Sequence, residues 1–405
     1  MKVNRILGIA MSASLLAAGS AMAQPVVDGS GATTEYGAPL YVNTTDPTGF
    51  GDSNLGVINW ANGSEIDAVY GVVDGGVLYL MVAGNLESNF NKIELFFDTT
   101  SGGQNQLRGD NPDVDFNGLN RMGDDGSGNG MIFDTAFEAD RYITMSGGDI
   151  GGGVYALFGN WAEVLTSGGG QGRFLGQGDA GTDGTLSGGD NPDGILMTID
   201  NSNVAGVTNS TATGGDLVDT GIEMAIPLSA LGNPAGDIKV VAFINGGGHD
   251  FLSNQVAGGV SGAGNLGEPR NVDFTQFAND QLVTVANGVS DCLTLDVQNL
   301  ISGQKADLTV TNGTPGAKVV TVYGFKAGST KVNNVAGYCA TFGIAGVNKQ
   351  RVVGGLNRVF DGSGSMTFQQ FIPNNAQGKT VLFQSAENGT CPDECVSNLV
   401  TQVVQ

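Results

Sequence analysis

Glycine is the residue that most constrains this chain: 67 of its 405 residues are glycine. Glycine weakens helices and suits tight turns. Beyond the N-terminal segment, no stretch repeats apolar residues at helical spacing, apart from one possible turn in residues 227–232 (PLSALG). Instead, short apolar or alternating runs recur, such as residues 68–73 (AVYGVV) and 77–84 (VLYLMVAG), which flank the hairpin-type turn Asp74-Gly75-Gly76. The pattern predicts an all-β chain.

Further strand-like runs are found on both sides of residue 288. They comprise residues 92–98, 141–146, 153–159, 194–200, 221–227, 238–245 and 281–286, and then 292–298, 305–312, 318–325, 365–372, 380–387 and 398–404. Long segments rich in Gly, Asn and Asp separate the first set, at residues 99–130, 167–194, 201–219 and 246–271. Loops of this length are uncommon unless something orders them. Apolar residues recur within them, so we expect partial order through packing on the body. They are Leu107, Phe116, Leu119, Met122, Phe174, Leu175, Phe251 and Leu252.

The N-terminus has the features of an export signal. Lys2 and Arg5 precede the apolar stretch ILGIAMSASLLAAG, which is followed by AMA just before Gln24. A basic start, a short apolar region and an A-x-A site are typical of a secretory signal peptide. About 14 apolar residues are too few to span a bilayer. We predict cleavage near Ala23, removing residues 1–23, and a mature protein that is secreted or held at the cell surface without direct membrane insertion.

The distribution of charge predicts two domains. Residues 24–288 contain 33 Asp and Glu against 7 Lys and Arg, a net charge of −26, whereas residues 289–405 have a net charge of +1. We therefore predict two β-sandwich domains in tandem, residues 24–288 and 289–405, the second smaller and immunoglobulin-like. The acidic first domain is a poor partner for nucleic acid, since phosphate contacts need Lys and Arg.

All four cysteines, Cys292, Cys339, Cys391 and Cys395, lie in the second part. An even number of cysteines in an exported chain favours disulfides over metal-thiolate sites. Three pairings are possible, and the spacing does not choose among them.

Several motifs occur in a familiar order. VDG near residue 27, the strand pair at residues 68–85, KIELFFD and finally GIEMAIPLSALG resemble the DOMON and family 9 carbohydrate-binding-module type of β-sandwich. Residues 133–143 and the C-terminal TPGAKVVTVYGF, GYCATFG and SNLVTQVV resemble secreted proteins of planctomycete-type bacteria with a disulfide-bearing C-terminal sandwich. The resemblance implies a non-catalytic binding or surface role and identifies no ligand.

The segment NPDVDFNGLNRMGDDG suggests a candidate calcium loop. Asp113, Asp115 and Asn117 occupy alternate positions before Gly118, and Asp124 stands where a calcium loop places its last oxygen ligand. Alternate side chains can converge on one ion, and Ca²⁺ takes about 6–8 oxygens. The competing interpretations are an acidic surface turn without an ion, and a catalytic carboxylate pair.

Exposed aromatic rings are the second kind of candidate site. Trp60, Tyr36 and Tyr41 could stack on sugar rings, whereas Trp161 sits in a strand pattern typical of core residues. The single histidine, His249, lies in a glycine-rich loop and is interpreted as a surface residue or a supporting donor. The chain has no G-x-S-x-G elbow and too few histidines for a His-based zinc site.

The sequence thus predicts a secreted, non-catalytic extracellular binding protein. Carbohydrate is the expected ligand, an extracellular polysaccharide or another cell-surface component is the expected partner, and calcium supports the acidic loops. The alternatives are a structural protein of the cell surface or extracellular matrix that self-associates and, less favoured, a secreted hydrolase.

Overall fold

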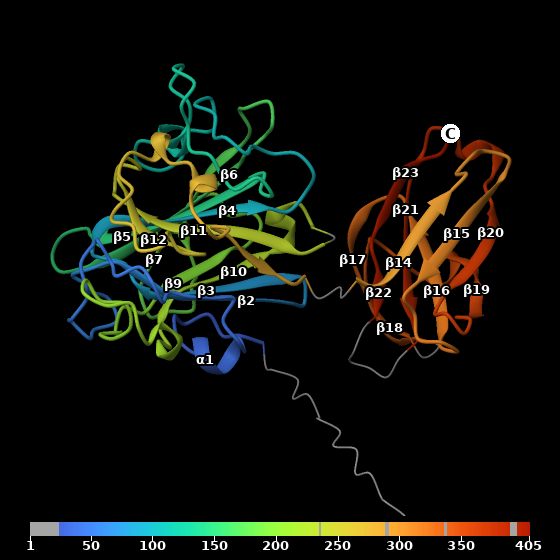
Figure 1. Ribbon diagram of the computed structural model, residues 1–405, viewed down its shortest axis with the longest axis horizontal. Coiled ribbons are helices and arrows are strands. Elements are labelled where there is room, and N and C mark those ends of the chain that lie inside the picture. Colours follow the sequence, from blue (N-terminus) through green and yellow to red (C-terminus); the bar gives the residue numbers. More distant parts are fainter. Residues whose placement is uncertain (1–23, 235, 288–290, 336–337, 389–394) are drawn as a thin grey trace, which may run out of the picture.

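The computed structural model describes residues 24–234, 236–287, 291–335, 338–388 and 395–405. Within these ranges the predicted all-β class is confirmed: strands dominate, and the α-helix is α1 (Ala32–Glu35). Figure 1 shows strands β1 to β13 in one group and β14 to β23 in another, and no described sheet contains strands from both. The predicted signal peptide and the boundary at residues 288–290 lie outside the described residues.

The first group forms two antiparallel sheets. The five-stranded sheet has the order β1-β2-β3-β10-β9, and the eight-stranded sheet has the order β12-β11-β4-β5-β6-β7-β8, with β13 also paired to β11. The strands of the five-stranded sheet are β1 (Tyr41–Val42), β2 (Glu65–Asp74), β3 (Val77–Asn85), β9 (Leu196–Ile199) and β10 (Gly221–Pro227). Those of the eight-stranded sheet are β4 (Asn89–Asp98), β5 (Arg141–Asp149), β6 (Tyr155–Glu163), β7 (Gly172–Gly178), β8 (Ser187–Gly188), β11 (Ile238–Asn245), β12 (Leu252–Val256) and β13 (Val283–Val285).

Alternation along β4 defines the two faces of the eight-stranded sheet. Ile93, Leu95 and Phe97 belong to the core that also contains inward residues of the five-stranded sheet. Lys92, Glu94 and Phe96 therefore lie on the opposite, outer face, because successive side chains of a strand alternate. Burial of both faces explains why KIELFFD is largely apolar, although Lys92 and Glu94 lie within it and Asp98 ends it.

Two of the long loops, residues 99–130 and 246–271, cover this outer face and build a second core on it. Leu107, Leu119 and Met122 of the first loop pack with Phe96 and Phe243 of the sheet. The first group also contains short 3-10 helices. These are η1 (Leu119–Met122), η2 (Gly215–Leu217), η3 (Leu228–Leu231), η4 (Pro269–Asn271) and η5 (Phe274–Gln276). The expected packing of the loops is thus confirmed for these residues, as it is for Leu175 and Leu252, but Phe116, Phe174 and Phe251 are 69%, 42% and 48% exposed.

Glu223 joins the N-terminal segment to the five-stranded sheet. Its carboxylate accepts hydrogen bonds from the backbone N–H groups of Asp28 and Gly29, both at 2.8 Å, and from the hydroxyl of Tyr36 at 2.6 Å. Glu223 is fully buried in the middle of β10. The early VDG and the late GIEMAIP segments therefore meet in space through this side chain and through the N–H of Gly221, which donates to the carbonyl of Gly29 at 3.0 Å.

The second group forms an eight-stranded sheet in the order β19-β16-β21-β22-β14-β15-β20, with β23 paired to β21, and a β17–β18 hairpin. Its end strands β19 and β20 contact each other, so the sheet curls and two halves enclose one core. Its strands are β14 (Asp291–Gln298), β15 (Lys305–Thr311), β16 (Lys318–Gly324), β17 (Ala327–Val335), β18 (Tyr338–Ile344), β19 (Val352–Val359), β20 (Met366–Phe371), β21 (Thr380–Glu387), β22 (Val396–Ser397) and β23 (Val400–Val403), and its 3-10 helices are η6 (Lys349–Arg351) and η7 (Asn374–Ala376).

The predicted disulfides involve three cysteines, Cys292, Cys339 and Cys391, whose side chains lie outside the described ones. The fourth, Cys395, is not a free thiol. The pairing of the four cysteines stays a prediction.

Two turns predicted from the sequence are present in the structure, whereas some strands were not predicted. Gly75 and Gly76 have φ of 59° and 86° in the β2–β3 hairpin, and the expected turn in PLSALG is η3. Strands β7, β8 and β12 lie within segments that the sequence presented as loops. Their glycine and polar residues lack the apolar alternation that predicts a strand. These strands form because they pair with neighbouring strands.

We predict that Glu223→Ala destabilises the first group by about 2–4 kcal/mol. Three buried or part-buried donors would lose their acceptor, and each such loss costs about 1–3 kcal/mol before relaxation. Urea unfolding followed by tryptophan fluorescence measures the change in the free energy of unfolding, because both tryptophans, Trp60 and Trp161, belong to this group. Glu138→Ala, at an exposed carboxylate, is the control. A loss as small as that of the control would show that the three hydrogen bonds to Glu223 add no net stability.

Candidate functional site

The loops leave one part of the outer face of the eight-stranded sheet open, and a recess of about 630 Å³ lies there. We call it the phenylalanine recess. It is lined by Asn89, Phe90, Lys92, Asp115, Phe116, Ser146, Phe158, Asn160, Phe174 and Gly247. Its volume is within the range of small-molecule sites, roughly 300–1,000 Å³.

Four phenylalanine rings give the recess its apolar character. Phe90, Phe116 and Phe174 are 38%, 69% and 42% exposed, and Phe158 is half-buried. The rings of Phe90 and Phe158 have centroids 6.4 Å apart. Large apolar side chains that stay exposed together usually mark a binding surface. Asn89, Asn160 and Ser146 add polar groups beside the rings.

Phe90 occupies its place through an unusual backbone conformation. It lies in an irregular part of the β4–β5 pairing and has φ of 68°, which is rare for a bulky residue. Opposite it stands Gly148, where an added Cβ would lie 2.6 Å from the ring of Phe90. The glycine thus makes room for the ring to lie flat against β5.

Charged side chains form the floor of the recess. Lys92 Nζ donates to Asp115 Oδ2 at 2.6 Å, and the lysine side chain is only 2% exposed. Behind this pair, Nδ1 of His249 lies 2.7 Å from Glu94 Oε1, and both residues are fully buried. Nε2 of His249 lies 3.4 Å from Asp115 Oδ2, a distance that fits an ion pair without a well-aligned hydrogen bond.

The four groups balance their charges when His249 is protonated. Burial by itself would lower the pKa of His249, but Glu94 and Asp115 outweigh it and raise this pKa to about 9. Burial works against the carboxylates too, yet His249 and Tyr142 lower the pKa of Glu94, and His249 and Lys92 lower that of Asp115. Two cations thus face two anions at neutral pH, which is the arrangement that buried charges require.

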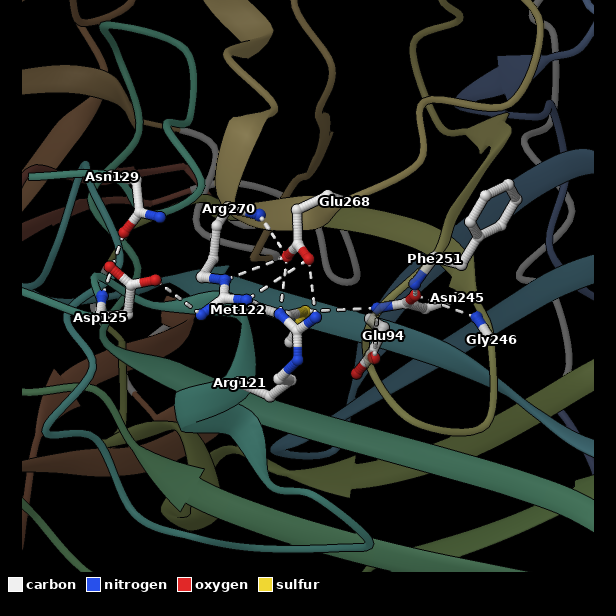
Figure 2. Close-up of polar contacts among 10 residues, drawn as sticks. All are labelled: Glu94, Arg121, Met122, Asp125, Asn129, Asn245, Gly246, Phe251, Glu268 and Arg270. Carbon is white, nitrogen blue, oxygen red and sulfur yellow. Dashed lines mark hydrogen bonds and ion pairs between the residues drawn. The ribbon is translucent and has the colours of Figure 1, made fainter. Parts of the chain in front are cut away.

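Asn245, at the end of β11, holds the loop that carries His249. Figure 2 shows its side-chain oxygen accepting from the N–H groups of Gly246 and Phe251, while its Nδ2 donates to Glu94 Oε1 at 3.2 Å. The same carboxylate therefore binds both the loop's anchor and its histidine. The loop between β11 and β12 is fixed at both ends.

A second set of contacts fixes the loop that carries Asp115. In Figure 2 the guanidinium of Arg121, in η1, makes a two-bond contact with Glu268 at 2.6 and 2.7 Å, and Arg270 contacts both Glu268 and Asp125. Arg121 lowers the pKa of Glu268 to about 2. These contacts of Arg121 and Arg270 hold the segment after Asp115 against the segment that follows β12.

Backbone strain is concentrated at this place. Phe90, Asp115, Asn117 and His249 have φ of 68°, 68°, 64° and 53°, and they are half of the non-glycine residues with positive φ among the described residues. Strained residues persist where the surrounding structure holds them, and they cluster at functional sites. This clustering, together with the exposed rings, makes the recess the candidate functional site.

The structure does not bring the predicted calcium ligands together. Asp115 faces Lys92, whereas Asp124 Oδ1 accepts from the N–H groups of Gly126 and Gly128 within its own turn. Asp113 and Asn117 lie near Gly118 and Gly248 respectively. Among the described residues, no three His, Cys, Asp or Glu side chains are placed to hold a metal ion. Asp124 thus lies in an acidic turn, which was the alternative to a calcium loop, and Asp115 belongs to the recess.

The predicted sugar-stacking rings are also placed differently. Tyr36 is 6% exposed and bound to Glu223, so it presents no open face to a ligand. Tyr41 and Trp60 are half-buried, and Trp60 packs edge-on against Tyr155. Trp161 is core, as expected, and donates to the carbonyl of Ala230. The surface interpretation of His249 is wrong, because Glu94 and Asp115 stabilise it in a buried position.

Several residues of the recess could not be singled out from the sequence. Phe90, Lys92 and Phe158 lie inside or beside strands, where an aromatic or a lysine gives no sign of its surroundings. One signal was available: a lysine and a glutamate at alternate positions of KIELFFD, a run otherwise buried on both faces, require buried partners of opposite charge.

Comparisons with known proteins give little further guidance. No family model matches the chain, and no curated protein matches it. A solved structure of a tetra-tandem repeat in the extending region of a large adhesion protein aligns over 81% of this chain and 70% of that one, with 12% identity and a TM-score of 0.18. That likeness is too low to define the fold or the function, and the resemblance to the DOMON and family 9 binding-module type stays a prediction. Of the described residues, no helix is long and apolar enough to cross a membrane.

We predict that the imidazole of His249 titrates near pH 9 instead of at its ordinary value of about 6.5. Because the pKa is raised on folding, this group's stabilising effect is complete below pH 6.5 and is lost as pH rises through 9. His249 is the single histidine, so proton–carbon NMR of histidine-labelled, tag-free protein reads it directly. Asp115→Asn should lower the midpoint by removing one of the two carboxylates. A midpoint at or below 6.5 in the unaltered protein would contradict the ion-pair network.

Proposed function

We propose that this protein is an extracellular, non-catalytic binding protein and that the phenylalanine recess binds carbohydrate. The observation that supports this most is the group of exposed phenylalanine rings over a rigid polar floor. Export rests on the N-terminal sequence, Lys2 to Ala23, which has the pattern of a signal peptide.

The lining of the recess suits a sugar chemically. Pyranose rings have an apolar face and a rim of hydroxyls, so they favour sites that combine aromatic rings with hydrogen-bonding groups. Phe116 and Phe174 supply exposed ring faces, and Asn89, Asn160 and Ser146 supply neutral polar groups. Ligand sites of this kind are largely apolar with a few placed polar groups.

The floor favours binding over catalysis. His249 is charged at neutral pH, so it holds no lone pair to accept a proton from a nucleophile. Lys92 and Asp115 neutralise each other at 2.6 Å. Such a closed network holds the recess in shape before a ligand arrives, which reduces the ordering cost of binding.

A glycan array and affinity electrophoresis on insoluble and soluble polysaccharides test the proposal. The double variant Phe116→Ala/Phe174→Ala should bind roughly tenfold or more weakly, because each ring contributes on the order of 1 kcal/mol and about 1.4 kcal/mol is tenfold in affinity. Both rings are exposed, so their removal should leave the melting temperature nearly unchanged.

The matched control is Phe371→Ala, which removes a phenylalanine of similar exposure, 53%, from β20 of the second group. It should bind as the unaltered protein does. Equal binding by the double variant would place the sugar site elsewhere. An absence of glycan binding, with sedimentation showing self-association, would favour the structural cell-surface role instead.

A further inference from the structure

A second polar cluster lies away from the recess, at the start of β2 in the five-stranded sheet. Glu65 and Asp67 are buried there, with 1% and 0% exposure. Asp67 is the extra residue of a β-bulge opposite Gly84. Gly84 has φ of 142°, and a Cβ on it would lie 2.2 Å from the carbonyl oxygen of Glu65, so the bulge depends on this glycine.

The two carboxylates differ in how they are satisfied. Asp67 accepts from the N–H of Val207 and, at 3.1 Å, from Asn203 Nδ2, both in the loop between β9 and β10. Neither carboxylate oxygen of Glu65 has a hydrogen-bond partner among the described residues. A buried carboxylate without partners is costly, so something else must stabilise it.

The segment that leads past residues 61–64 contains another unpartnered oxygen. The hydroxyl of Ser53 is buried and has no hydrogen-bond partner among the described residues. Its segment runs antiparallel to residues 61–64, which precede β2, since Phe50 forms a bridge with Ser64 and the N–H of Asn54 donates to Asn62 Oδ1. The neighbouring Asp52 is close enough to raise the pKa of both Glu65 and Asp67.

No basic side chain of the described residues neutralises this cluster. Among the described residues, no Lys, Arg or His forms an ion pair with Asp52, Glu65 or Asp67. Burial raises the pKa of Glu65 and Asp67 far above the ordinary value, and Asp67 raises that of Glu65 further. The carboxylates can therefore be stabilised in two ways: they hold protons, or they hold a cation.

We propose that Glu65 and Asp67 bind a divalent cation of the calcium type. The donors are all oxygens, which suits hard cations and not zinc or copper. No third His, Cys, Asp or Glu joins them as a ligand among the described residues, so the remaining positions fall to hydroxyl and carbonyl oxygens or water. Ca²⁺ accepts such mixed and irregular sets better than Mg²⁺ does.

This site is independent of the recess, which lies on the outer face of the other sheet. It is also distinct from the Asp113–Asp124 loop, whose carboxylates are used in other contacts. Loss of glycan binding and loss of cation binding would thus be separate results.

The test uses the mature chain, stripped with chelator and dialysed. Calorimetric titration with calcium chloride and thermal melting with calcium or chelator are compared for the unaltered protein and Glu65→Gln. We expect the unaltered protein to melt several degrees higher with calcium, since a ligand that binds only the folded state stabilises it. Glu65→Gln should bind one calcium fewer and lose this rise. Because it removes a buried acid without changing shape, its chelated form should melt no lower than the chelated unaltered protein.

Two controls make the result specific. Glu138→Gln neutralises an exposed carboxylate, and Asp113→Asn alters the loop predicted from sequence; both should keep the Glu65-dependent response. Calcium binding that is equal in Glu65→Gln and the unaltered protein would overturn the proposal. So would a complete absence of calcium binding. A fall in melting temperature from pH 5 to pH 9 that is smaller in Glu65→Gln than in the unaltered protein would then show that Glu65 holds a proton instead, because the His249 contribution is common to both proteins.

Discussion

The outer face of the eight-stranded sheet carries Lys92 and Glu94 within an apolar strand, and two loops that cover this face supply the groups that satisfy them. A buried charge is tolerated only with a partner of opposite sign. Asp115 and His249 provide these partners from two loops far apart in the chain. Their distances of 2.6 and 2.7 Å fix where both loops lie, and the second core under the loops can close only with them in place.

This requirement also explains why the recess stays open. The loops are pinned at the ion pairs and at the Arg121–Glu268 contact, so they cannot shift to cover Phe116 and Phe174. Those rings remain 69% and 42% exposed although each belongs to a segment with other apolar residues that are fully buried. Strain at Phe90 and Asp115, with φ of 68° at both, is the cost of this geometry.

The class of fold could be predicted from the sequence because strand alternation and turn glycines act over a few residues. Gly75 and Gly76 form the expected turn, and η3 forms where PLSALG allowed a helical turn. The site could not be predicted in the same way, since Asp115 was chosen for its spacing to Asp113 and Asn117, and its position depends on Lys92, 23 residues before it. The polar, glycine-rich sequence around His249 is typical of an exposed loop. The residue is nevertheless buried, because its partners come from β4 and from a distant loop. Short-range spacing thus predicts elements, while pairing between buried charges across loops needs the tertiary structure.

The large excess of acidic residues in the first group has a structural use that its composition did not suggest. Buried carboxylates repeatedly accept from backbone N–H groups of loops: Asp46 from Val260 and Gly262, Asp140 from Thr99 and Thr100, and Glu223 from Asp28 and Gly29. Each such contact satisfies donors that a long loop would otherwise leave unpaired when it packs on the body. The negative charge of this group is therefore in part a means of ordering its loops. Glu65 departs from this pattern, since it is as deeply buried as the others but receives no N–H group from the described residues. Its carboxylate is the one in this series whose stabilisation the chain's own amides do not explain, and a bound cation would supply it.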